Sequence, residues 1–103
     1  MQLIFYGHSC FEIQIGEQRL LFDPFITGNL LASHININEI KPDFILISHA
    51  HSDHIQDALQ IGQRNNATLI ANYEVTEWFK SKGWNGGFGL NHGGKVKLDF
   101  GVV

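Results

Sequence analysis

Apolar positions in the first part of the chain follow the short runs and two-residue alternation of β-strands. The apolar run at residues 3–6 predicts a first strand. Apolar and polar side chains alternate over residues 11–15, which is typical of a half-buried strand. After a short turn, residues 19–23 are predicted to return as the partner strand of a hairpin. Residues 24–42 show neither period and are expected to form an irregular loop.

The middle of the chain alternates between strand and helix patterns. The apolar run at residues 44–48 predicts a buried central strand. Residues 54–65 carry apolar side chains at helical spacing, with a possible glycine stop at Gly62. Another strand is predicted at residues 67–71. Because a strand–helix–strand run joins parallel neighbours, these two strands should pair in parallel.

The last third predicts a second helix and a final strand. The helix is expected over residues 72–83, followed by a flexible glycine-rich turn at residues 86–89. Residues 95–103 alternate again and predict a further strand. This order, a hairpin followed by βαβα and a last strand, predicts an α/β fold. We expect a mixed sheet with helices on one face, in a single domain of residues 1–103.

The composition narrows the classes of protein that the chain can represent. A chain of 103 residues with 44% hydrophobic side chains fits one globular domain with a modest core. The net charge of −3 gives no reason to expect a nucleic acid or an anionic membrane surface as partner. The single cysteine, Cys10, cannot form an internal disulfide, and no signal peptide or membrane-spanning run is recognisable. We therefore expect a cytoplasmic protein with Cys10 buried in its core.

Histidine and carboxylate side chains are concentrated directly after the predicted central strand. His49, His51, Asp53 and His54 fall within one stretch of six residues. Imidazole nitrogen and carboxylate oxygen are ligands for zinc, manganese, iron and nickel, and a strand end fixes the direction in which they point. Residues i and i+2 of an extended chain share a side, so His49 and His51 can reach one metal ion. This spacing favours a metal site over a solvated histidine-rich loop.

The other two members of the cluster are adjacent and would point apart on a strand. At a turn into a helix, Asp53 and His54 can instead converge on a second site. Ser52 or Asp53 is the predicted N-cap of that helix. The positive end of the helix dipole would then face the site.

The stretch His49-Ala50-His51-Ser52-Asp53-His54 resembles the HxHxDH signature of the metallo-β-lactamase superfamily. Other blocks resemble the UPF0173 group of metal-dependent hydrolases and follow one another in family order along most of the chain. They are Gly7-His8-Ser9-Cys10-Phe11, Leu21-Phe22-Asp23-Pro24-Phe25, Thr27-Gly28-Asn29, Ala71-Asn72-Tyr73-Glu74 and Asn91-His92-Gly93-Gly94.

The resemblance implies a fold and a set of ligands. The fold would be the N-terminal half of a metallo-β-lactamase-type αββα sandwich, because complete members are considerably longer. His49 and His51 would bind a first divalent ion, and Asp53 and His54 a second, with Asp53 also orienting the nucleophilic water. Zinc is the favoured ion, with manganese, iron or nickel as alternatives. The remaining ligands of complete members come from a second half.

Two residues outside the cluster are further candidates. His8 follows a strand and a glycine, so it can lie at the same sheet edge, as a structural histidine or, by resemblance, as a metal ligand. Asp23 ends a strand, either as a turn aspartate or, by resemblance, beneath the metal site where it orients ligand histidines. The residues expected to lie outside the site are the solvated His34, the incidental His92, and the helix-capping Asn72 and Glu74.

Two functions fit this pattern. The first is a metal-dependent hydrolase in which an activated water attacks an ester, amide or phosphodiester bond of a small-molecule substrate, with Asp53 as catalytic residue. The visible ligands are few for two ions, so the chain is expected to be incomplete. The alternative is a non-catalytic metal-binding half-domain that assembles with a second chain or copy. One half-sandwich would expose an apolar sheet face, so we expect a homo-oligomer or association with the missing C-terminal half.

Overall fold

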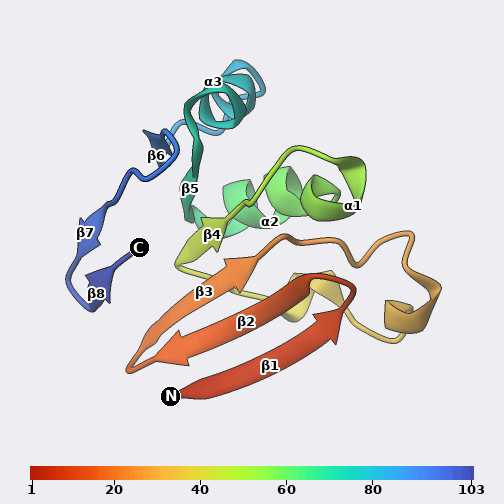
Figure 1. The fold of residues 1–103 in the computed structure, drawn as a ribbon. Helices are drawn as coiled ribbons and strands as arrows, with labels where there is room; N and C mark the ends of the chain where they lie inside the picture. The colour runs from red at the N-terminus through yellow and green to blue at the C-terminus, as the bar shows by residue number, and fades with distance from the viewer.

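The computed structural model of the chain describes residues 1–103. Six strands form one mixed sheet in the order β1-β2-β3-β4-β5-β6, and two further short strands form a separate hairpin (Figure 1). The strands are β1 (Gln2–Gly7), β2 (Cys10–Ile15), β3 (Gln18–Phe22), β4 (Phe44–Leu46), β5 (Thr68–Asn72), β6 (Gly87–Leu90), β7 (Lys97–Leu98) and β8 (Gly101–Val102). The helices are α1 (Ser52–Ile55), α2 (Ala58–Asn65) and α3 (Tyr73–Ser81), with 3-10 turns η1 (Leu30–Ala32) and η2 (Ile37–Glu39).

Both predicted strand pairings are present. Strand β2 runs antiparallel to β3, as the hairpin pattern predicted, and β1 lies antiparallel on the other side of β2. Strands β3, β4, β5 and β6 are parallel to one another, which confirms the predicted parallel pair. Since β1 is separated from β3 by one antiparallel strand, β1 and β3 to β6 all point their carboxyl ends toward the same edge of the sheet.

The helices cover one face of the sheet, which confirms the predicted α/β class. Ile61 of α2 and Phe79 of α3 belong to a core of 15 buried residues on this face. The opposite face holds a smaller cluster around Leu20 and Leu46, against which Val96 and the β7–β8 hairpin pack. The sheet is therefore covered by helices on one face and only in part by the hairpin on the other.

The helix predicted over residues 54–65 is two helices. The helix is interrupted between α1 and α2 at Asp57. The Oδ2 atom of Asp57 accepts hydrogen bonds from the backbone N–H of Ile26 at 2.7 Å and of Thr27 at 2.8 Å. The backbone N–H of Asp57 donates to the carbonyl of Pro24 at 3.0 Å instead of to a preceding helical turn. These bonds to a distant loop interrupt the backbone hydrogen bonds of the helix. The local sequence pattern gives no sign of them.

The glycine stop predicted at Gly62 is wrong for a similar reason. Helix α2 passes through Gly62, and a side chain at this position would collide with the ring of Trp84. Trp84 is 4% exposed and its indole N–H donates to the carbonyl of Ala67 at 2.8 Å. Gly62 therefore makes room for a buried tryptophan, and the helix ends at Asn66, which has a left-handed backbone.

Two expectations for the last third also need correction. The glycine-rich segment predicted as a flexible turn forms β6, where a Cβ on Gly87 would lie 2.8 Å from the Leu69 carbonyl oxygen of β5. The absence of a side chain thus permits close pairing with β5. The alternating residues 95–103 form the β7–β8 hairpin and add no strand to the main sheet.

The alternation over residues 11–15 marks a strand correctly, but the polar side is the more buried one. Glu12 is 1% exposed, whereas the flanking Phe11 and Ile13 are only half-buried. Neither carboxylate oxygen of Glu12 has a hydrogen-bond partner of good geometry, and Arg19 Nη1 lies 4.0 Å from Oε1. Burial raises the pKa of Glu12, and Arg19 and the Tyr6 hydroxyl counteract only part of this effect.

We expect Glu12→Gln to raise the free energy of unfolding at pH 7 by about 1–2 kcal/mol, because glutamine removes a buried negative charge that lacks hydrogen-bond partners. Because the folded pKa lies above the unfolded value, the native chain holds this proton more tightly. The destabilisation is absent below the unfolded pKa and grows as the pH rises through the folded pKa. Urea denaturation from pH 4 to pH 8 measures it, with the exposed Glu17→Gln as control. Identical pH dependence in the two variants would contradict this prediction.

Candidate metal centre

The candidate residues follow three strands that end at the same edge of the sheet. His8 comes directly after β1, Asp23 directly after β3, and residues 48–54 follow β4 and enter α1. Parallel strand ends therefore bring together groups that are far apart in the sequence. The expectation that His8 reaches the edge occupied by the cluster is confirmed.

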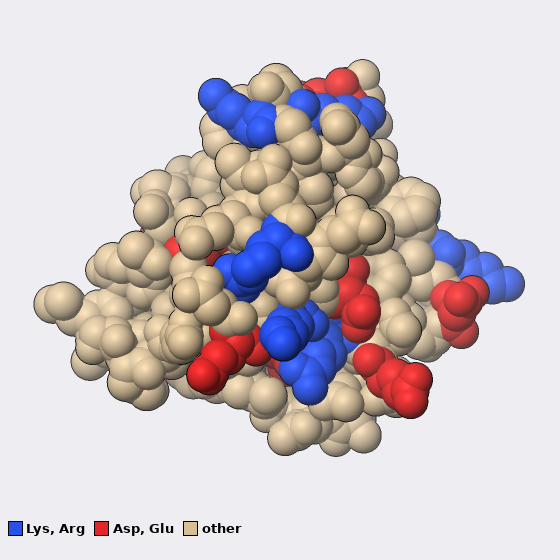
Figure 2. All heavy atoms as spheres, turned by 180° about the vertical axis from the view of Figure 1, so that it is seen from behind, with Lys and Arg blue, Asp and Glu red and all other residues tan.

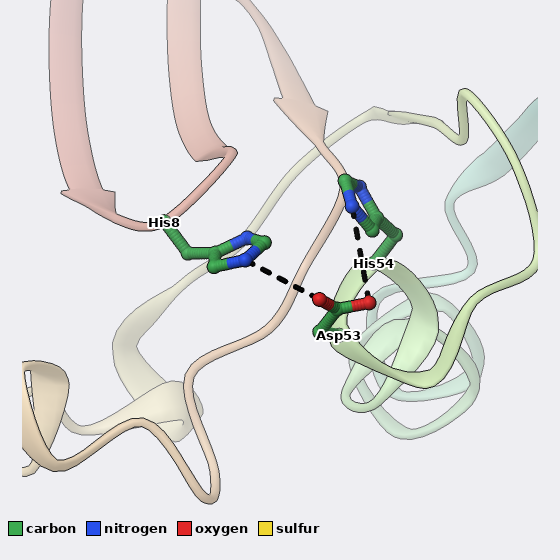
Figure 3. A group of neighbouring side chains, drawn as sticks. All are labelled: His8, Asp53 and His54. Carbon is green, nitrogen blue, oxygen red and sulfur yellow. Dashed lines mark ion pairs between the residues drawn. The ribbon is translucent and has the colours of Figure 1, made fainter.

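Three of these side chains form a compact group that offers nitrogen and oxygen ligands. One ligand atom from each of His8, Asp53 and His54 lies within 4.8 Å of the others. His8 Nε2 is 3.3 Å from Asp53 Oδ2, and His54 Nε2 is 3.9 Å from Asp53 Oδ1. Figure 3 shows the Asp53 carboxylate between the two rings. The His8 ring packs edge-on against Phe25, with centroids 5.5 Å apart.

The other two histidines of the cluster form a pair beside this group. His49 Nε2 lies 2.9 Å from His51 Nδ1, so the two rings converge as their spacing predicted. The centroid of the His49 ring is 4.0 Å from that of His54. All five predicted ligand residues therefore lie around one edge of the sheet, as a pair and a group of three.

Asp23 lies beneath these rings and connects them to β4. Its Oδ1 accepts the backbone N–H of Ser48 at 2.7 Å, and its Oδ2 accepts the Ser48 hydroxyl at 2.6 Å. Oδ2 is also 2.9 Å from His54 Nδ1. Asp23 is 8% exposed, so these contacts occur in a region largely shielded from water.

This network fixes which nitrogen of each ring can bind a cation. A carboxylate oxygen only accepts, so His54 donates its Nδ1 hydrogen to Asp23, which leaves Nε2 as the ring nitrogen available to a cation. Ser48 gives its one hydroxyl hydrogen to Asp23, so at 2.9 Å it accepts from His49 Nδ1. His49 Nε2 is then the nitrogen of that ring available to a cation. Metal-binding histidines are commonly held in this way through their other ring nitrogen.

Two of these residues have unusual backbone conformations. His8 has φ +54° and Asp23 has φ +41°, in the left-handed region that non-glycine residues seldom adopt. Such conformations cost about 1–3 kcal/mol and concentrate at functional sites. Both residues contribute side chains to the cluster at the strand ends, His8 toward Asp53 and Asp23 toward His54.

The predicted N-cap of the helix after the cluster is wrong. His51 occupies the N-cap of α1 and makes no side-chain capping bond, since its Nδ1 faces His49. The Asp53 carboxylate faces His8 and His54. Helix α1 has only four residues, so its dipole contributes less than a full helix would. Asn72 caps α3 as predicted, accepting the Val75 N–H at 2.8 Å.

Several polar residues have structural roles that the sequence did not indicate. Ser48 joins Asp23 to His49, and Asp57 anchors residues 26 and 27 of the loop. The only sequence signal was their proximity to the histidine cluster.

His34 is exposed, as expected. Cys10 is fully buried, and burial raises the pKa of its thiol to about 12, so it remains a neutral core residue.

Charges on the face behind the view of Figure 1 are mixed. Figure 2 shows lysine and arginine side chains interspersed with aspartate and glutamate. This face therefore presents no continuous patch of one sign.

No helix of the chain combines the length and apolar character needed to cross a bilayer.

The donor set fits a divalent cation. Imidazole nitrogens and a carboxylate are ligands that zinc accepts, and His49 and His54 each have Nε2 available for an ion. The sheet edge and the ring-orienting aspartate define an α/β domain with a candidate metal-binding edge. The sequence profile described as "Beta-lactamase superfamily domain" matches residues 2–95, so the chain belongs to this family.

Within the superfamily, the chain is similar to UPF0173 metal-dependent hydrolases, as the sequence blocks predicted. It is 45% identical over 103 residues to one from Flavobacterium johnsoniae, covering all of this chain and 45% of that protein. It is 49% identical over 104 residues to one from Enterococcus faecalis, covering all of this chain and 46% of that protein. The chain thus spans about half the length of the curated relatives that it matches.

A solved structure supports the same family. A metallo hydrolase from the hyperthermophilic archaeon Ignicoccus hospitalis superposes with a TM-score of 0.83 at 37% sequence identity. The match covers 94% of this chain and 42% of that chain. The fold described here is therefore α/β of the metallo-β-lactamase type.

Proposed function

We propose that this chain provides the metal-binding edge of a metal-dependent hydrolase that acts on small-molecule substrates. The observation that carries the proposal is the convergence of His8, Asp53 and His54 within 4.8 Å at the carboxyl ends of parallel strands. The names of the similar relatives support it, since they are metal-dependent hydrolases. The buried, unpaired Cys10 supports a cytoplasmic location.

Two zinc ions are the proposed cofactor. His49 and His51 would hold one ion, and Asp53 and His54 the other, with His8 as an additional ligand. His8 increases the number of groups at the second ion beyond the two that the HxHxDH stretch supplies. Manganese, iron and nickel accept the same ligands.

The residues of this chain would position the reaction. A bound divalent ion would supply Lewis-acid polarisation of the scissile bond and activation of water for attack on an ester, amide or phosphodiester. The side chain of Asp53 is 47% exposed, so one carboxylate oxygen can accept a hydrogen bond from a water and orient it. Asp23 holds His54 directly and His49 through Ser48, so both rings are preorganised before any ligand arrives.

A second candidate function is a non-catalytic metal-binding module that pairs with another chain. The observation that favours it is the open part of the sheet face opposite the helices. Leu3 is 66% exposed and Phe5 is 68% exposed, and the half-buried Phe11 and Ile13 pair with them in register on β2. Apolar surface of this kind marks an interface.

Zinc binding tests the first function. We expect His54→Ala and His49→Ala each to weaken zinc binding by about 100-fold or more, since loss of an orienting partner alone costs about 10–100-fold. Equilibrium dialysis with elemental analysis measures the zinc content, and His34→Ala, an exposed histidine outside the cluster, is the control. Native mass spectrometry of the same samples gives the oligomeric state.

The outcomes separate the two functions. Two zinc ions per chain, reduced only in the cluster variants, support the hydrolase. Zinc content that is equal in His34→Ala and His54→Ala would refute the site. Stable pairing of chains with one weakly bound zinc ion or none per chain would favour the module.

A further inference from the structure

A polar cavity lies beside the candidate metal ligands, at the carboxyl ends of β4, β5 and β6. Its volume is about 210 Å³. One lining residue is apolar and the others are polar: Ser48, Asn72, Glu74, Leu90, Asn91 and His92. In open parallel sheets, ligands bind in crevices outside the carboxyl ends of the strands. The sequence interpretation left Asn72, Glu74 and His92 outside the site, whereas the fold brings them together there.

The polar groups of this cavity have unused hydrogen-bonding capacity. Asn72 uses only its Oδ1, which accepts from the Val75 N–H at 2.8 Å, so its amide hydrogens remain available. The exposed side chains of Glu74, Asn91 and His92 form no hydrogen bond or ion pair within the chain. They are therefore free to hydrogen-bond a ligand.

The cavity is connected to the candidate metal centre by one residue. Ser48 lines the cavity, and its hydroxyl oxygen is 2.9 Å from His49 Nδ1. A molecule that reaches the metal ligands can thus extend past Ser48 into the cavity.

The charge of the lining selects the kind of group that fits. Glu74 is the only acidic lining residue, and no lysine or arginine lines the cavity. A carboxylate accepts hydrogen bonds and repels anions, whereas the amides of Asn72 and Asn91 offer both donors and acceptors. The lining therefore matches a polar group that carries no negative charge, such as a hydroxyl or an ammonium.

We propose that this cavity binds a hydroxyl- or ammonium-bearing part of the substrate, with Glu74 as the residue that discriminates against anionic groups. This inference rests on the proposed function for its connection to catalysis. Asn91 and His92 hydrogen-bond the same group from the end of β6. Substrates with a phosphate or carboxylate at this end are disfavoured.

Three probes of matched size test the proposal: ethanolamine, ethylene glycol and glycolate. In NMR titrations of the isotope-labelled chain, ethanolamine and ethylene glycol are expected to shift the resonances of Asn72, Asn91 and His92, and glycolate is not. Glu74→Gln should weaken ethanolamine binding by about fivefold, the factor expected for an exposed ion pair, and leave ethylene glycol binding unchanged.

The matched control is Glu77→Gln, which removes the same charge from α3 outside the cavity, where Glu77 pairs with Lys80 at 2.8 Å. Glycolate binding as tight as ethanolamine binding would overturn the proposal, as would equal effects of the two glutamate variants or no response to any probe. The titrations need no metal. If the chain binds zinc but the cavity does not discriminate among the probes, only this inference is refuted. If the cavity discriminates among the probes but the chain does not bind zinc, only the proposed metal centre is refuted.

Discussion

Replacement of Asp23 by alanine is expected to reduce zinc affinity by about 100-fold and the free energy of unfolding by about 2–3 kcal/mol. The variant loses the acceptor for the Ser48 N–H and hydroxyl and for His54 Nδ1. It also places alanine at φ +41°, where its Cβ is strained. Calorimetric zinc titration and urea denaturation measure the two effects.

Asp23→Asn separates these causes. Asparagine tolerates the left-handed backbone and can still accept the Ser48 N–H, so the free energy of unfolding should fall by about 1 kcal/mol or less. The negative charge that holds both His54 and Ser48 is lost, so zinc affinity should still decrease. Unchanged zinc affinity in both variants would show that the histidines need no support from Asp23.

Asp57→Ala is expected to lower the free energy of unfolding by about 3 kcal/mol, because two backbone N–H groups lose a buried charged acceptor. Ile26 is 3% exposed and Asp57 itself is 3% exposed, so water cannot readily replace the carboxylate. The loop after β3 would lose its attachment to the break between α1 and α2. Urea denaturation of the metal-free chain measures this loss.

Asp43→Ala is the matched control for Asp57. The Asp43 carboxylate accepts one exposed backbone N–H, from Arg19 at 2.8 Å. Water can replace that contact, so the expected loss is about 1 kcal/mol or less. A similar loss in the two variants would mean that burial of the Asp57 contacts adds nothing to stability.

The parts of the fold that follow from local patterns were predictable. The hairpin, the parallel pair β4–β5 and the helix after Asn72 depend on periodicity and capping within short segments. The convergence of His49 and His51 likewise follows from their i, i+2 spacing at a strand end.

The parts that depend on distant contacts were not predictable from one sequence. The break at Asp57 requires the N–H groups of residues 26 and 27, and Gly62 is needed because Trp84 packs against it. Burial of Glu12 instead of its apolar neighbours depends on which face of the sheet the helices cover. The position of His8 after a strand placed it at the correct edge, but its role as a ligand and the orienting role of Asp23 were suggested only by resemblance, since both local sequences are equally typical of a turn.

The position of β1 at the edge of the sheet has a consequence for handling the protein. One side of its backbone has no neighbouring strand, and residues 2–7 contain no lysine, proline or other residue that discourages strand addition. The exposed side chains of Leu3 and Phe5 lie along the same strand. Concentrated samples should therefore be prone to edge-to-edge aggregation, and a single lysine in place of Leu3 is the simplest way to protect that edge without changing the cluster at the other end of the strand.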